Sequence, residues 1–378
     1  WGTNAVDLTG TDIDVKSDDV ILMDLRGISS LDSLNLDNKF RGAGGFLSGA
    51  NITTGSNAFK YKYAVIDGIT FNVNSDLDKG DSSSTSDGYI FARRLLLQNS
   101  EINVNAGKNV TANLNTADLT SIGGANIPVG IAVAASSNSK VPANNKTGIN
   151  NDGNVTVNRT DSGNGGVGLY VNYGKINNNA SGKVEVEATK NNPHAVGIYG
   201  TNSTPIVNAG EVTVGGEKSF GILGLSYRLD SKGNLVDHVS EPFATSAGDF
   251  GKIEITNNKI VTMNDDSAIG IYVLNNSSKA STVRGNNETW ATNTATGTIT
   301  MNGSNNAIGM AGSKATLTNA GVINVNGTKS AGMYANNSSV VTNANTGTIN
   351  VVVTSSGNES IGMFTDDVNT KLSTAGTI

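Results

Sequence analysis

The sequence of 378 residues contains no cysteine, which excludes disulfide bonds and thiolate ligands for metals. Charged residues make up only 15% of the chain and the net charge is −6, so a basic surface for nucleic acid is missing. No stretch approaches the roughly 18–20 apolar residues of a membrane-spanning helix. The low charge and the frequent Val and Ile argue against a disordered chain.

Glycine is abundant, with 46 residues, and it recurs in two short motifs that alternate from Gly130 to Ile378. The first motif reads apolar-Gly-aliphatic, usually followed by an aromatic residue. It occurs as "VGIA", "VGLY", "VGIY", "FGIL", "IGIY", "IGMA", "AGMY" and "IGMF", around Gly130, Gly168, Gly197, Gly221, Gly270, Gly309, Gly332 and Gly362. The second motif reads Gly-x-(Ile/Val)-x-apolar. It occurs as "GNVTV", "GKVEV", "GEVTV", "GKIEI", "GTITM", "GVINV", "GTINV" and "GTI", from Gly153, Gly182, Gly210, Gly251, Gly297, Gly321, Gly347 and Gly376.

Both motifs alternate with a period of two, which predicts half-buried β-strands rather than helices. In the second motif we expect the β-branched residue two after the glycine to face the core. In the first motif we expect the residues that flank the glycine to face inward, as Ala331 and Met333, and the glycine and the aromatic Tyr334 to face outward. A third, weaker apolar position lies between the motifs, at Ile176, Ile206, Leu317, Val341 and Leu372.

The compact units repeat every 23 to 30 residues or so, enough for three short strands and three turns. Asn, Gly, Ser and Asp fill the predicted turns, where side chains bond their own backbone. We therefore predict an all-β fold, a right-handed parallel β-helix (β-solenoid) with three short strands per coil and loop insertions. Residues 122–378 form its regular part. For residues 1–121 we expect irregular coils of the same helix or, alternatively, a cap subdomain.

The repeat is interrupted twice, by Leu225–Phe250 and by Val273–Thr296. Both insertions occur in the same interval of consecutive coils, so we expect them to emerge on the same side. Aromatic and Arg side chains in loops on a polar scaffold are typical of contact sites. The candidate ligand-binding residues are Tyr227, Arg228, Asp230, His238, Phe243, Phe250, Arg284 and Trp290. The alternative is that both loops only decorate the solenoid, with Trp290 packed on its side.

Enzymatic activity has weaker support. "GDSSS" at Gly80–Ser84 is close to the serine-protease "GDSGS", but Ser83 replaces a glycine that the oxyanion site needs, and the only histidines, His194 and His238, lie far downstream. A polysaccharide-active β-helix would need clustered carboxylates. The doublets Asp18/Asp19, Asp265/Asp266 and Asp366/Asp367 are poor pairs, because adjacent strand residues face opposite ways.

A metal site is not indicated either. Asp76, Asp78 and Asp81 surround Gly80 in "NSDLDKGD", which faintly resembles a calcium loop. A full calcium loop has more ligands and a bidentate Glu at its end, so an ordinary acidic turn is the better interpretation. We expect no catalytic residues, no metal and no cofactor.

The Asn/Gly/Thr-rich coils resemble a known family. Repeat units such as "SAGMYANNSSVVTNANTGTINV" (Ser330–Val351), without cysteine, are similar to the passenger regions of type V autotransporters. More narrowly, they resemble the large outer-membrane autotransporter adhesins of fusobacteria, including the arginine-inhibitable type. The resemblance covers about Ile122 to Ile378 well and residues 1–121 only loosely.

The resemblance implies a secreted passenger at the bacterial outer-membrane surface, carried there by a C-terminal β-barrel that this fragment of a larger passenger lacks. Its expected partner is a host-cell surface glycoprotein or receptor, or another bacterium's surface, and it is expected to be a monomer with no nucleic-acid partner. Two alternatives stay open: a polysaccharide-active β-helix enzyme and a stalk that binds nothing itself.

Overall fold

The computed structural model describes short strand segments before residue 101 and most of the chain after it. From residue 101 on, the described residues exclude 115–119, 123–124, 128, 135–146, 160–164, 173, 190, 202–203, 227, 230–234, 237–252, 276–288 and 354–358. The described part is all β-structure and holds no helix that is long and apolar enough to cross a membrane.

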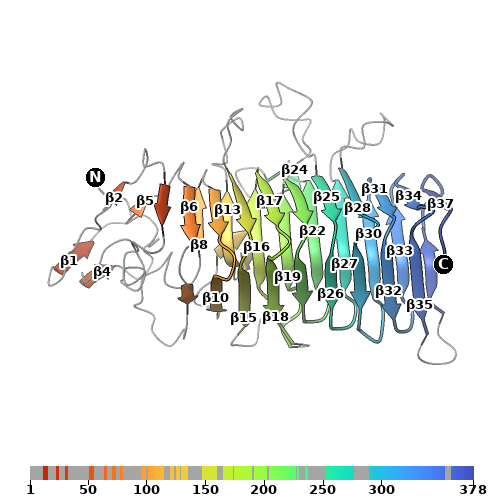
Figure 1. Cartoon of the computed structure of the whole chain (residues 1–378), viewed down its shortest axis with the longest axis horizontal. Helices are drawn as coiled ribbons and strands as arrows, with labels where there is room; N and C mark the ends of the chain where they lie inside the picture. The colour runs from red at the N-terminus through yellow and green to blue at the C-terminus, as the bar shows by residue number, and fades with distance from the viewer. Residues whose placement is uncertain are drawn as a thin grey trace, which may run out of the picture.

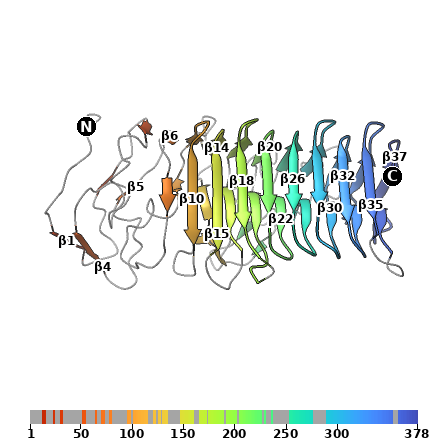
Figure 2. The same ribbon diagram turned by 60° about the horizontal axis from the view of Figure 1, so that its bottom comes forward.

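Three parallel sheets form the β-helix, and between residues 95 and 352 each coil contributes one strand to each sheet, in the order A, B, C. Figures 1 and 2 show the coils stacked along one long axis, from orange β6 to blue β37. The predicted parallel β-helix with three short strands per coil is confirmed.

Sheet A has nine strands, and all of them except the first carry the first motif. They are β8 (Leu95–Gln98), β13 (Val129–Ala134), β16 (Val167–Asn172), β19 (Val196–Thr201), β22 (Phe220–Ser226), β27 (Ile269–Asn275), β30 (Ile308–Ser313), β33 (Ala331–Asn336) and β36 (Ile361–Phe364). Sheet B has eleven strands. They are β3 (Ser30–Asp32), β6 (Thr70–Val73), β9 (Glu101–Val104), β14 (Gly148–Asn151), β17 (Lys175–Asn178), β20 (Pro205–Asn208), β25 (Ile253–Asn257), β28 (Thr289–Asn293), β31 (Thr316–Asn319), β34 (Val340–Asn343) and β37 (Lys371–Thr374).

Sheet C has nine strands, most of which carry the second motif. They are β7 (Leu77–Lys79), β10 (Asn109–Leu114), β15 (Asn154–Arg159), β18 (Lys183–Glu187), β21 (Glu211–Val214), β26 (Ile260–Met263), β29 (Thr298–Met301), β32 (Val322–Asn326) and β35 (Thr348–Val352). Four two-stranded pairs complete the described strands. They join β1 (Asp12–Val15) with β4 (Asn51–Thr54), β2 (Met23–Asp24) with β5 (Ala64–Val65), β11 (Thr120–Ile122) with β12 (Ala125–Ile127), and β23 (Arg228–Leu229) with β24 (Leu235–Val236).

The regular sheets begin before residue 122. Strands β9 and β10 pair in register with β14 and β15, and β6 and β3 extend sheet B back to Ser30. The rest of the predicted division at residue 121, including a cap subdomain, falls largely outside the described residues and stays a prediction.

The two sequence motifs fit together inside each coil. A β-carbon added to a first-motif glycine would lie 2.5 Å from Val212 Cγ1 at Gly197 and 2.4 Å from Ile299 Cγ2 at Gly270. The glycines therefore face the core and make room there for the β-branched residues of sheet C. The predicted outward glycine is wrong: Gly332 and Met333 are both buried, whereas Ala331 lies on the outer face beside Tyr334.

One second-motif assignment is also wrong. "GKIEI" at Gly251 contains β25 of sheet B, and the sheet C strand of that coil is β26, "IVTM". Gly221 accordingly faces Val261, and not Ile253. The alternation of β-branched residues is common to sheets B and C, so it does not distinguish them.

The third apolar position is confirmed as core at Ile176, Ile206, Leu317 and Val341, while Leu372 and Ile378 in the last coil are exposed.

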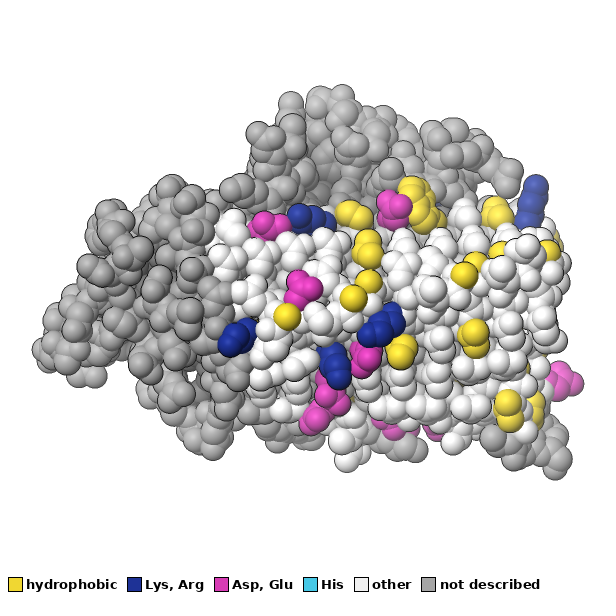
Figure 3. Space-filling model, viewed as in Figure 1, with side chains coloured by type: hydrophobic (Ala, Val, Ile, Leu, Met, Phe, Trp, Pro, Cys, Tyr) yellow, Lys and Arg dark blue, Asp and Glu magenta, His cyan; other side chains and the backbone are white. Residues whose placement is uncertain are grey.

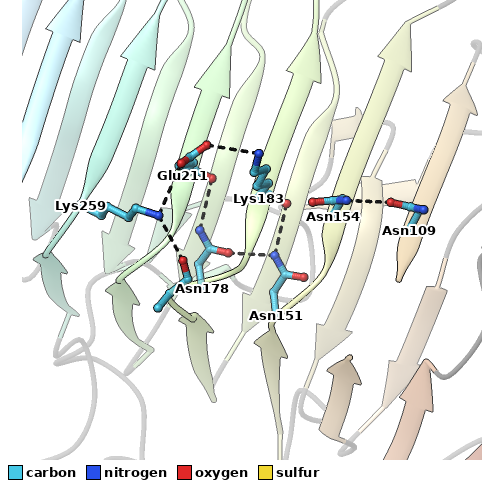
Figure 4. Close-up of polar contacts among 8 residues, drawn as sticks. Asn109, Asn151, Asn154, Asn178, Lys183, Glu211 and Lys259 are labelled. Atoms are coloured by element: carbon cyan, nitrogen blue, oxygen red, sulfur yellow. Dashed lines mark hydrogen bonds and ion pairs between the residues drawn. The ribbon is translucent and has the colours of Figure 1, made fainter. Parts of the chain in front are cut away.

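A ladder of asparagines runs inside the corner between sheets B and C. Seven fully buried asparagines end successive sheet B strands: Asn151, Asn178, Asn208, Asn257, Asn293, Asn319 and Asn343. In each of the first six asparagines, Nδ2 donates to Oδ1 of the next asparagine in the series at 2.7–2.9 Å (Figure 4). Most of these Nδ2 groups also donate to a backbone carbonyl near the start of a sheet C strand. We call this the asparagine ladder. It begins at Asn151, whose Oδ1 has no donor because Val104 holds the equivalent place in the preceding coil.

Candidate functional site

The two insertions leave the β-helix at one corner, where the chain passes from sheet A to sheet B. Ser226 pairs with Asn275 at the end of β22 and β27, and Ile253 pairs with Thr289 at the start of β25 and β28. The two connections, 227–252 and 276–288, thus start and finish side by side in neighbouring coils. A third long connection, 135–147, also joins a sheet A strand, β13, to a sheet B strand, β14.

The insertion bounds need correction. Leu225 still belongs to β22, and Val273 is a fully buried residue of β27. At the other end, "TWATN" forms β28, in which Ala291 fills the third core position. This strand was missed because Ala is the smallest residue to occupy that position among the described coils.

Trp290 was predicted as a loop residue, and this is wrong. It lies on the outer side of β28, half-buried, between Glu254 and Thr316 of the neighbouring coils. Arg228 lies in β23, which pairs antiparallel with β24 within the first connection. The other candidates lie outside the described residues: Tyr227, Asp230, His238, Phe243, Phe250 and Arg284.

The outer face of sheet A carries a strip of apolar side chains. Val167, Tyr170, Val196, Tyr199 and Leu223 are buried against one another, with Phe220, Leu225 and Tyr272 packed beside them. Ring contacts link successive coils: Tyr170 lies 5.3 Å from Tyr199, and Phe220 lies 5.8 Å from Tyr272, between ring centroids. We call this the sheet A strip.

A groove of about 600 Å³ opens on this face over β30, β33 and β36. Its floor is Ala331, with Ile308 and Ile361 in register on either side. The aromatic wall is formed by Tyr334 and Phe364, whose rings stack at 5.7 Å and 20°. We call it the sheet A groove.

A polar row forms the opposite wall, at the corner between sheets C and A. Asn306, Lys329 and Glu359 line the groove there and are exposed. They lie two positions before the registered residues Ile308, Ala331 and Ile361, so the three occupy the same place in successive coils. Asn306 and Lys329 both have a left-handed φ of 54°. The wall thus offers an amide, an ammonium and a carboxylate along the axis.

Tyr334 is held in place on its own wall. Its hydroxyl donates to Asp366 at 3.0 Å and accepts from the Asn336 amide at 3.2 Å. Partial burial, and next the hydrogen bond and charge of Asp366, raise the pKa of the Tyr334 phenol. The aromatic wall is therefore neutral and fixed in orientation around pH 7.

This groove was not among the sites predicted from the sequence, although the sequence holds a signal for it. "AGMY" is the only first-motif copy that begins with a small residue. At the same register the other sheet A strands from β16 onward carry Val167, Val196, Phe220, Ile269, Ile308 and Ile361.

Charge is sparse on the surface that the structure describes. Figure 3 shows a mostly uncharged polar face with scattered acidic, basic and apolar side chains. Lys183 and Lys259 both approach Glu211, at 3.7 and 3.4 Å (Figure 4). Lys175 pairs with Glu101. Among the described residues, no three His, Asp or Glu side chains are grouped to hold a metal ion.

The carboxylates of Asp265 and Asp266 accept hydrogen bonds from the backbone of turns in the neighbouring coils. Asp265 accepts the Gly216 N–H at 2.7 Å from the preceding coil, and Asp266 accepts N–H bonds of Ser304 and Asn305 from the next. Asp367 likewise accepts the Ser338 N–H, and this bond leads the contacts that lower its pKa. These carboxylates bind different turns.

No protein-family model, no curated protein and no solved structure matches the chain.

Proposed function

We propose that this chain is part of a bacterial surface adhesin, a secreted passenger that attaches to host cells or to another bacterium. The observation that carries the proposal is the placement of the long connections. Most described coils pass from sheet A to sheet B in a few residues, whereas 227–252 and 276–288 leave neighbouring coils at that corner. Long loops gathered on a rigid scaffold are a common arrangement for recognition.

The composition of these connections agrees with the proposal. The first contains Tyr227, Phe243 and Phe250, and the second contains Arg284. Large aromatic and Arg side chains dominate the energy of protein contacts. In the regular coils many polar side chains form the asparagine ladder or bind turns, which suits a scaffold. The resemblance to autotransporter passengers adds the expected location, outside the cell at the outer-membrane surface.

The first test is adhesion by the purified chain coupled to beads. We expect beads that carry the folded chain to attach to cultured epithelial cells or to a second bacterial species several-fold more than uncoated beads. Beads that carry the denatured chain serve as the matched control and should not attach. Attachment no greater than that of uncoated beads, on every surface tried, would contradict the proposal. It would favour the alternative that the chain is a stalk that binds nothing itself.

A parallel assay addresses the enzymatic alternative. The same preparation is incubated with neutral and acidic polysaccharides, and released oligosaccharides are measured. Because the Asp265/Asp266 carboxylates bind turns, we expect no product. Product release that a single Asp→Asn change abolishes would support a polysaccharide-active enzyme instead.

A further inference from the structure

We propose that the sheet A groove binds a neutral oligosaccharide that lies along the axis of the β-helix. The inference deepens the proposed function by naming a ligand class, and its biological meaning rests on that function. The lining of the site contains no residue of the long connections: the site lies over β30, β33 and β36, on the side of sheet A toward sheet C.

The groove exists because one side chain is small. Ala331 stands where both neighbouring coils carry isoleucine, Ile308 and Ile361. The outer surface of sheet A is therefore lower over this one coil, by most of the length of an isoleucine side chain. The backbone of β33 continues in register through the dip, so it is a gap in the side-chain layer and not a bend of the sheet. A gap of this kind is preformed and costs no rearrangement to fill.

The two walls of the groove match the two kinds of surface that a sugar ring has. A pyranose presents apolar C–H groups on its faces and hydroxyls around its rim. Tyr334, held by Asp366 and Asn336, and Phe364 supply an apolar wall. The row of Asn306, Lys329 and Glu359 supplies donors and acceptors across from it. Predominantly apolar pockets with a few convergent polar groups are typical ligand sites.

The direction of the groove indicates an extended ligand. The polar row repeats once per coil, and neighbouring parallel strands lie about 4.8 Å apart. Asn306 and Glu359 are therefore separated by two spacings, on the order of 10 Å. Such a row can contact successive rings of a linear chain.

Charge and hydrogen bonding disfavour other polymers. Lys329 and Glu359 carry opposite charges on adjacent coils, so the wall attracts neither a polyanion nor a polycation. A peptide that binds by adding a strand needs free backbone groups. The backbone of β33, at the centre of the groove, is already paired with β30 on one side and β36 on the other. Binding must rest on side chains.

The test compares the intact chain with Ala331→Ile, which restores the isoleucine of the adjacent coils. Because this residue is already accommodated at the same register on both sides, the variant is expected to fold with an unchanged melting temperature. The control is Val340→Ile, which adds one methyl group on the outer side of sheet B in the same coil. The probes are neutral linear tri- and tetrasaccharides of hexoses and N-acetylhexosamines, with sialylated, sulfated and short peptide probes beside them.

We expect the intact chain and Val340→Ile to bind at least one neutral oligosaccharide with the same Kd. Ala331→Ile should weaken that binding tenfold or more, and Tyr334→Ala by about tenfold, the usual effect of losing a central aromatic contact. The proposal is overturned if no neutral oligosaccharide binds, if Ala331→Ile leaves binding intact, or if only charged or peptide probes bind. Cell adhesion is read separately on beads, so adhesion without oligosaccharide binding would reject the groove proposal and leave the adhesin proposal standing.

Discussion

Asn293→Leu is expected to lower the free energy of unfolding by about 3 kcal/mol or more, because it breaks the asparagine ladder at its middle. Asn293 accepts from Asn257 at 2.8 Å and donates to Asn319 at 2.8 Å, and all three are fully buried. Leucine can make neither bond. It leaves a buried donor on one side and a buried acceptor on the other, at about 1–3 kcal/mol each.

A chemically identical contact on the surface provides the control. Asn350 Nδ2 donates to Asn324 Oδ1 at 2.8 Å on the outer side of sheet C, where water can replace the bond. Asn324→Leu should therefore change stability by no more than about 0.5 kcal/mol. The measurement is urea denaturation followed by far-UV circular dichroism. Equal shifts of the midpoint for the two variants would show that the buried ladder has no special role in stability.

Gly309→Ala is expected to destabilise the protein by about 3 kcal/mol, at the upper end of the usual cost of overpacking. A β-carbon there would lie 2.3 Å from Ile323 Cγ2 and 2.6 Å from the Gly332 carbonyl oxygen. The second contact is to backbone of the next coil, so no rotamer change relieves it. The coil has to open or shift, and its pairing with β33 is lost with it.

Gly312→Ala in the same strand is the matched control. Its β-carbon would meet the flexible end of Leu317 at 3.0 Å, and the next coil already carries a buried alanine, Ala335, at this register. We expect a loss within about 1 kcal/mol. Thermal denaturation of the two variants compares them directly. A Gly309→Ala variant as stable as Gly312→Ala would contradict the packing described for the two motifs.

The coil architecture could be predicted from the sequence because its signals are local. A glycine that faces the core and a β-branched residue opposite it recur in every regular coil, and period-two alternation marks the strands around them. The prediction failed where two structures share one pattern. "GKIEI" has the spacing of a sheet C strand but lies in sheet B, and only the contact between Gly221 and Val261 decides between them.

The asparagine ladder could not be recognised from composition, because asparagine is also favoured in turns. Its sequence signal is an apolar residue, any residue, then Asn, as in "INN" at Ile176 and "LTN" at Leu317. Whether such an Asn is buried depends on a partner at the same position one coil away, which is a property of the stack. The groove is similar: Ala331 becomes a gap only when Ile308 and Ile361 are known to flank it.

The most direct measurement for the proposed function is bead adhesion by a chain that lacks both 227–252 and 276–288. The deletion joins Ser226 to Ile253 and Asn275 to Thr289, which by register reproduces the compact Lys314–Ala315 connection of the next coil. We expect the variant to keep its far-UV circular dichroism spectrum and its oligosaccharide binding, while attachment falls to the level of uncoated beads. Undiminished attachment by the folded variant would contradict the assignment of the contact site to these two connections.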